Sequence, residues 1–176
     1  MGTRNMKTNE QKQALLNHSE IVNMFSYDAA IGRLRWEIKK RGIVIGDIAG
    51  GSDGANGYRT VKINYQKYGE HRLVWFFHNG AWPTAQIDHI NGVRDDNRIE
   101  NLREVTSGQN AQNIRAPQKN GRSGYLGVAW RGALGKWRAL IQVNGKRKEL
   151  GCFDDPREAH AAYISAKRAL HPYNTI

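Results

Sequence analysis

The sequence predicts an α+β protein made of two modules, and two patterns of residues carry this prediction. Between Ile87 and Asn113, two short apolar runs separated by a polar loop precede a helix-forming segment, which gives the order strand, loop, strand, helix. Beyond residue 124, three strand-like runs precede one amphipathic helix. A chain of 176 residues with 39% hydrophobic residues suits two small cores better than one large core.

The chain should begin with a disordered segment, residues 1–20, because this stretch is polar and offers at most a short helix. The first domain then covers 21–115. A hairpin is expected at 25–36, where two short strand-forming runs flank a turn. A glycine-rich loop follows, and the alternating run 58–64 predicts a half-buried strand before a short helix over 71–79.

The strand–loop–strand–helix segment completes this domain. Its strands are predicted at 86–90 and 102–105, on either side of a polar loop. Ser107 is suited to cap the helix that follows, because a serine hydroxyl can accept a hydrogen bond from the first turn. That helix would carry Asn110 and Asn113.

A basic linker is expected at 116–123, and the second domain covers 124–176. Its strands are predicted at 127–131, 136–143 and 146–153. Together they should form a three-stranded antiparallel sheet.

The turn and the final helix of this domain have clear local signals. Asn144 and Gly145 form a strong two-residue hairpin turn between the last two strands. The helix starts with Asp155 as its N-cap and Pro156 in its first turn, and it ends before Pro172. Its small alanines should let it pack closely against the apolar side of the sheet, which consists of Trp137, Ala139, Ile141 and Val143.

The charge of the chain points to a polyanionic partner. The formal net charge is +11 and the pI is about 10.0. Between Val105 and Lys148 there are nine Lys and Arg residues and no Asp or Glu. Because each cation set against a phosphate releases condensed counterions, this stretch is expected to lie on nucleic acid.

Cysteine content and hydropathy indicate the cellular compartment in which the protein is expected. The single Cys152 excludes an internal disulfide and a cysteine-rich zinc site, so no structural zinc is expected. No apolar run approaches the ~20 residues of a membrane span, and the polar start lacks a signal-peptide core. We therefore expect a cytoplasmic protein with no membrane partner.

Four polar residues of the first domain are of the types found in sites that cut phosphodiester bonds. Asp88 offers a hard oxygen ligand beside His89, whose imidazole can accept a proton near neutral pH. Asn101 and Asn110 follow, and their amides can orient the imidazole and complete a cation site. His71, which flanks an apolar segment, is expected to be structural.

The motif Asp88-His89-Ile90-Asn91-Gly92, followed by Asn101-Leu102 and Asn110, resembles the HNH endonucleases, in particular the homing endonucleases of phages. The resemblance covers about residues 25–113. It implies that His89 is the general base for an attacking water and that Asn101 holds its ring. It also implies that Asp88 and Asn110 bind one divalent cation, Mg²⁺ or Mn²⁺. Many members have His where this chain has Asn110, and the amide favours harder cations.

The second domain resembles the Apetala2/ERF DNA-binding domain, through Tyr125-Leu126-Gly127-Val128, Gly135-Lys136-Trp137-Arg138-Ala139 and Leu150-Gly151-Cys152-Phe153. This resemblance implies a sheet laid in the major groove with the helix behind it. Ala129 and Leu134 replace residues that are usual in the plant family, so plant base preferences do not transfer. The residues expected to bind DNA are Lys119, Arg122, Arg131, Lys136, Arg138, Gln142, Lys146 and Arg147.

These patterns together predict a metal-dependent, site-selective DNA endonuclease of the homing type. It would act on double-stranded DNA as a monomer, in the host cytoplasm if phage-encoded. The main alternative is a DNA-binding regulatory protein with an inactive nuclease remnant, which the complete set of four site residues argues against. An RNA-binding structural protein is disfavoured because the sheet lacks paired exposed aromatic residues for base stacking.

Overall fold

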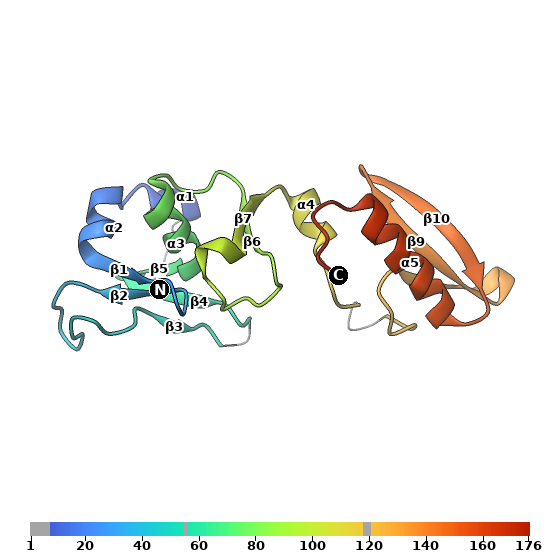
Figure 1. The fold of residues 1–176 in the computed structure, drawn as a ribbon, viewed down its shortest axis with the longest axis horizontal. Helices are drawn as coiled ribbons and strands as arrows, with labels where there is room; N and C mark the ends of the chain where they lie inside the picture. The colour runs from blue at the N-terminus through green and yellow to red at the C-terminus, as the bar shows by residue number, and fades with distance from the viewer. Residues whose placement is uncertain (1–7, 55, 118–120) are drawn as a thin grey trace, which may run out of the picture. The chain divides into compact units, whose positions relative to one another are not determined.

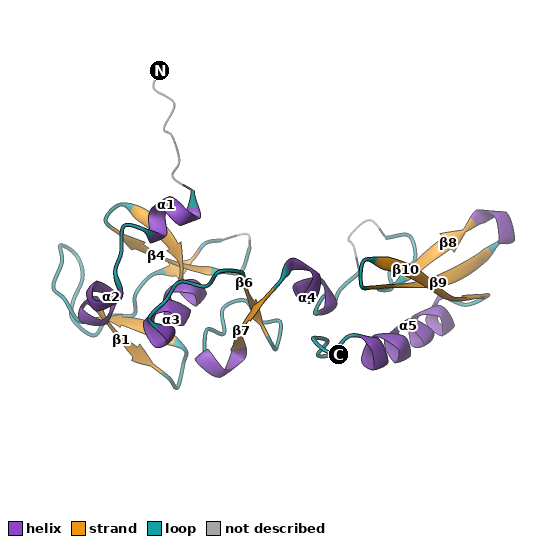
Figure 2. Ribbon diagram, turned by 90° about the horizontal axis from the view of Figure 1, so that it is seen from above, coloured by secondary structure: helices purple, strands orange, loops and turns teal. Residues whose placement is uncertain are grey.

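The computed structural model describes residues 8–54, 56–117 and 121–176 (Figure 1). The chain divides into two compact units, Met1–Glu104 and Val105–Ile176. Both combine helices and strands, as Figure 2 shows, so the predicted mixed α and β class is confirmed. Among the described residues, no helix is long and apolar enough to cross a membrane.

The first unit contains three small sheets and the helices that pack with them. Strands β1 and β2 pair in an antiparallel hairpin, β3, β4 and β5 form an antiparallel sheet in that order, and β6 lies beside β7. The elements are α1 (Asn9–Gln13), α2 (His18–Met24), β1 (Phe25–Asp28), β2 (Arg33–Trp36), β3 (Gly51–Ser52), β4 (Arg59–Ile63), β5 (Gln66–Gly69), α3 (Glu70–Asn79), β6 (Gln86–His89), a 3₁₀ helix (Ile99–Asn101) and β7 (Leu102–Val105).

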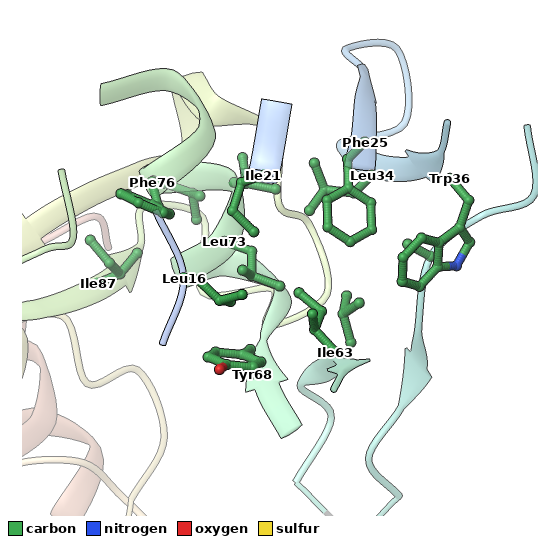
Figure 3. Packing of buried hydrophobic residues seen from close by; sticks show 14 residues of the cluster. Leu16, Ile21, Phe25, Leu34, Trp36, Ile63, Tyr68, Leu73, Phe76 and Ile87 are labelled. Atoms are coloured by element: carbon green, nitrogen blue, oxygen red, sulfur yellow. The ribbon is translucent and has the colours of Figure 1, made fainter. Parts of the chain in front are cut away.

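Alternating strand residues and one face of α3 build the core of this unit (Figure 3). In β4 the predicted pair Val61 and Ile63 is fully buried. Leu73 and Phe76 of α3 point into the same cluster, because residues three apart share a helix face. Gly80 ends α3 in the left-handed conformation (φ 71°), which glycine adopts without steric cost.

The expected disorder of residues 1–20 is wrong for the part that the structure describes, which begins at Thr8. Helices α1 and α2 form there, and Leu16 and Ile21 are buried in the core. A capping box starts α2, since Asn17 Oδ1 accepts from the Glu20 amide (2.9 Å) and the Glu20 carboxylate accepts from the Asn17 amide (2.9 Å). This local signal outweighs the polar composition of the segment.

The second unit begins with a short helix and ends in the predicted sheet and helix. Its strand order is β10-β9-β8, with both pairs antiparallel. Figure 2 shows α5 lying along one side of this sheet, and Ala159 and Tyr163 of α5 are buried against Ala139 and Ile141. The elements are α4 (Ser107–Gln112), β8 (Val128–Arg131), a 3₁₀ helix (Gly132–Leu134), β9 (Lys136–Val143), β10 (Lys146–Phe153) and α5 (Pro156–Leu170).

The capping signals of this unit are largely as predicted. Asp155 caps α5 and accepts from the Arg157 amide (2.7 Å), with Pro156 in the first turn. The cap of α4 is Thr106 rather than the expected Ser107. The Thr106 hydroxyl accepts from the Gln109 amide (3.3 Å), and the Thr106 amide donates to the side-chain oxygen of Gln109 (2.8 Å).

The boundary between the units falls at Glu104/Val105, earlier than the expected linker at 116–123. The reason is a set of contacts between the end of α4 and the C-terminal tail. Thr175 donates to the Asn113 side chain (2.5 Å), and Lys167, which is buried in α5, donates to the Ile114 carbonyl. Burial first, and then the nearby charge of Arg115, lowers the pKa of Lys167 to about 8.

We predict that Gly127→Ala is much more damaging than Gly135→Ala, although both glycines have positive φ (77° and 59°). A Cβ at Gly127 would lie 2.0 Å from the buried Tyr163 ring, whereas a Cβ at Gly135 meets nothing within 4 Å. Backbone strain alone costs about 1–3 kcal/mol at either position, and the clash adds to it only at Gly127. Thermal unfolding of the two variants measures the difference. Equal losses of stability would contradict the packing described here.

Candidate active site

Strand β6 places Asp88 and His89 next to each other in the first unit, and both side chains are buried. Because successive strand residues point to opposite faces, the carboxylate and the imidazole do not compete for the same space. The Ile90 amide donates to the Asn101 carbonyl (2.8 Å), and the Gly92 amide turns back to the His89 carbonyl (2.9 Å). These bonds fix the start of the polar loop between β6 and β7.

Asn101 closes this loop and does not hold the His89 ring, which corrects the role expected for it. Its Nδ2 donates to Asn91 Oδ1 (3.0 Å) and to the Asp96 carbonyl (2.8 Å), while its Oδ1 accepts from the Asn91 amide (2.9 Å). Asn97 instead meets the ring, with its Oδ1 3.0 Å from His89 Nε2. Sequence spacing alone could not tell which amide in the loop reaches the imidazole.

Asp88 is oriented by an arginine on the neighbouring strand. Arg103 of β7 donates from Nε (2.9 Å) and Nη2 (2.7 Å) to the same carboxylate oxygen, Oδ2. A charge-assisted pair of this kind fixes the plane of the carboxylate in a partly buried place. The fourth predicted residue, Asn110, lies on α4 in the second unit.

Aromatic and basic side chains surround His89. The rings of Tyr58 and His71 lie 5.9 Å and 5.5 Å from the His89 ring, centroid to centroid, and the Arg94 guanidinium lies 5.1 Å above Tyr58. Burial, reinforced by the charges of His89 and Arg72, lowers the pKa of His71 to about 4. His71 was expected to be structural, and its position beside His89 could not be read from the sequence.

The second unit offers a candidate surface for DNA on the side of the sheet away from α5. Direct partners across an antiparallel pair share a face, so Ala129, Arg138 and Cys152 lie together. By the same register this face carries Arg131, Lys136, Gln142 and Arg147.

Of the other three predicted DNA-binding residues, the two that the structure describes fall outside this face. Lys146 pairs with Val143 and so lies on the α5 side of the sheet, which corrects its expected place among the reading residues. Arg122 stacks its guanidinium 5.3 Å from the Trp130 ring, and Trp130 packs on Trp137. Lys119 lies outside the described residues.

Comparison with known proteins gives the class of the stretch from β5 to α4. Residues 68–112 match the profile of the family described as HNH endonuclease, so this stretch is an HNH endonuclease domain. A domain of this class supports nuclease activity and implies DNA as substrate, and HNH nucleases generally use a divalent metal.

One relative extends the comparison over most of the chain. The protein is 30% identical over 114 residues to "Protein 3.8" of Escherichia phage T7, an alignment that covers 64% of this chain and 93% of that protein. The chain therefore belongs to the same family as Protein 3.8. No solved structure matches it. The likeness of residues 124–176 to the Apetala2/ERF domain stays a prediction.

We predict that His71 makes folding stability depend on pH. Its pKa is 6.5 when unperturbed and about 4 in the folded protein, so unfolding lets the imidazole take up a proton between these values. The free energy of unfolding should therefore fall as the pH drops from 6.5 toward 4, by at most about 1.4 kcal/mol per pH unit from this group. Denaturant titrations should show a flatter dependence in His71→Gln. A slope equal to that of the wild type in this window would contradict burial of a neutral His71.

Proposed function

We propose that the protein is a metal-dependent, site-selective DNA endonuclease of the homing type. The observation that carries this proposal is the buried Asp88–His89 pair inside an HNH endonuclease domain, with His89 hydrogen-bonded to Asn97 and Asp88 held by Arg103. In this proposal the first unit supplies the general base, and the sheet of the second unit selects the cleavage site.

His89 acts as the general base in this mechanism. Its imidazole takes a proton from a water molecule as that water attacks the scissile phosphorus, and Asn97 keeps the ring in place during the transfer. Arg103 keeps the Asp88 carboxylate in a fixed orientation. With one such histidine in each chain, a monomer would cut one strand at a time.

The proposed cation ligands are Asp88 and Asn110. Among the described residues, no cluster of three or more His, Cys, Asp or Glu side chains could hold a metal ion. One carboxylate and one amide oxygen would suit a hard cation, Mg²⁺ or Mn²⁺. When bound, the cation would stabilise negative charge on the leaving 3′ oxygen.

The regulatory alternative is a DNA-binding protein whose nuclease domain is inert. Both functions predict binding to double-stranded DNA, so binding alone does not separate them. Incubation of the purified protein with a supercoiled plasmid library and Mg²⁺, followed by mapping of the ends, separates them directly. Defined nicks or breaks support the endonuclease, and an intact plasmid supports the regulator.

The first prediction concerns His89→Ala, which removes the proposed base and leaves Asp88 and the second unit unchanged. Plasmid cleavage should fall by at least ~10²-fold, because a positioned general base contributes about that much or more, while DNA binding stays near the wild-type value. His18→Gln is the control, since His18 lies on α2 and bonds to the Phe77 carbonyl (2.9 Å). Cleavage at the parental rate by His89→Ala would refute the mechanism.

The second prediction uses two neighbouring cations of β10 that lie on opposite faces. Arg147 pairs with Gln142 on the face away from α5, and Lys148 pairs with Ile141 on the α5 side. Arg147→Ala should relax the choice of one or two base pairs, since an arginine that reads a guanine edge contributes ~1–3 kcal/mol of discrimination. Lys148→Ala should leave the site profile as it is.

Sequencing of cleavage sites for both variants at one salt concentration makes this comparison, because phosphate contacts depend steeply on salt. If Arg147→Ala and the equivalent change at Arg138 both leave the site profile unaltered, recognition does not reside in this face of the sheet.

A further inference from the structure

Glu70 is a fully buried carboxylate at the start of α3, with 0% of its surface exposed. Three donors converge on it. Arg59 Nε and Asn97 Nδ2 donate to Oε2 at 2.6 Å and 3.1 Å, and the Leu34 amide donates to Oε1 at 3.3 Å. A carboxylate can only accept in such a setting, and a buried one is retained only when paired and hydrogen-bonded.

The direction of these bonds determines how the Asn97 amide faces His89. An asparagine side chain has one donating end, Nδ2, and one accepting end, Oδ1. Because Glu70 takes the donating end, Oδ1 is turned toward His89 Nε2, 3.0 Å away. An amide oxygen cannot donate, so Nε2 must carry the hydrogen in this bond.

A neutral imidazole has one N–H group, and its other nitrogen carries the lone pair. With the hydrogen on Nε2, the lone pair lies on Nδ1. Asn97 and His89 are 1% and 4% exposed, so bulk water does not compete for these bonds. The buried Glu70 carboxylate therefore orients the Asn97 amide, and the Asn97 amide determines which nitrogen of His89 is basic. We call this chain of hydrogen bonds the relay.

We propose that Glu70 is a positioning residue that, through Asn97, sets His89 in the tautomer protonated at Nε2 and so makes Nδ1 the proton-accepting nitrogen. Arg59 supports it by holding the charge of Glu70 in place. The catalytic consequence rests on the proposed endonuclease function. The tautomer itself does not, because it is a property of the folded protein without DNA.

The test removes the acceptor that orients the Asn97 amide. Arg59 and Asn97 donate to the same oxygen of Glu70, Oε2, so a glutamine at this position would keep its own carbonyl oxygen there. The paired change Arg59→Leu with Glu70→Leu instead removes the carboxylate together with its buried partner, which avoids an unpaired buried charge and lets the Asn97 amide turn its oxygen away from His89. Adding Asn97→Asp to this pair restores an acceptor beside Nε2, because both oxygens of a carboxylate can accept. Glu37→Leu, at an exposed position, is the control.

The main readout is the ¹⁵N–¹H correlation spectrum of the His89 ring at one fixed pH without DNA or metal. We expect the hydrogen on Nε2 in the wild type and in Glu37→Leu, a shift toward Nδ1 in the variant with Arg59→Leu and Glu70→Leu, and a return to Nε2 when Asn97→Asp is added. A merely structural role of Glu70 would not move this equilibrium in opposite directions. If the paired leucine variant does not fold, Asn97→Ala, which leaves the Arg59–Glu70 pair in place, should also lose the preference for Nε2.

Cleavage gives the second readout. The variant with Arg59→Leu and Glu70→Leu should lower the turnover rate by about 10²-fold with little change in DNA affinity, and the addition of Asn97→Asp should recover part of the loss. A hydrogen on Nδ1 in the wild type, or a tautomer insensitive both to the paired leucine change and to Asn97→Ala, would overturn the proposal even if the protein cuts DNA. A wild-type protein that shows the expected tautomer but cuts no DNA supports the relay and refutes the endonuclease.

Discussion

The ion pair between Arg59 and Glu70 is the interaction on which the first unit depends most. It joins β4 to the start of α3, and the same carboxylate also bonds to the backbone of β2 and to the loop between β6 and β7. A buried charge that lost any of these partners would be strongly destabilising, because its desolvation would no longer be compensated. The elements that surround His89 are therefore joined through one buried carboxylate.

The second unit is stabilised by packing of apolar side chains. Its core is small and apolar, and close approach of α5 to the sheet depends on small residues, Ala139 and Ala159, at the contact. A β-bulge between Glu149 and Gly151 adds Leu150 to the residues that pack on this core. The alternation of β9 then places Lys136, Arg138 and Gln142, together with Leu140, on the other face. The period-two alternation of β9 therefore places apolar side chains against α5 and cations on the opposite face.

Local patterns in the sequence predict much of this architecture. The hairpin at 25–36, the strand with Val61 and Ile63, the Asn144–Gly145 turn and the helix capped by Asp155 all form near their expected places. Each depends on residues close together in the chain. The register of Lys146 could also have been read, since a two-residue turn pairs it with Val143 and so fixes its face.

The parts that sequence reasoning missed are mostly long-range. Glu70 and Asn97 are 27 residues apart, and nothing in the spacing of polar residues indicates that they touch. The motif identified His89 but could not show which of two loop amides would bond to its ring. The order of residues 8–20 is the exception, because the Asn17–Glu20 capping box is visible in the sequence and predicts a helix there despite the polar composition of the segment.

The position of the single cysteine has a practical consequence. Cys152 is a free thiol that pairs with Arg138 across the sheet and lies within 3.9 Å of an Arg131 nitrogen, on the face away from α5. A thiol-reactive photocrosslinker or fluorophore attached to the native chain would therefore sit among these arginines without any engineered residue. Whatever molecule this face meets can be captured covalently, and the crosslinked peptide and partner can be identified by mass spectrometry.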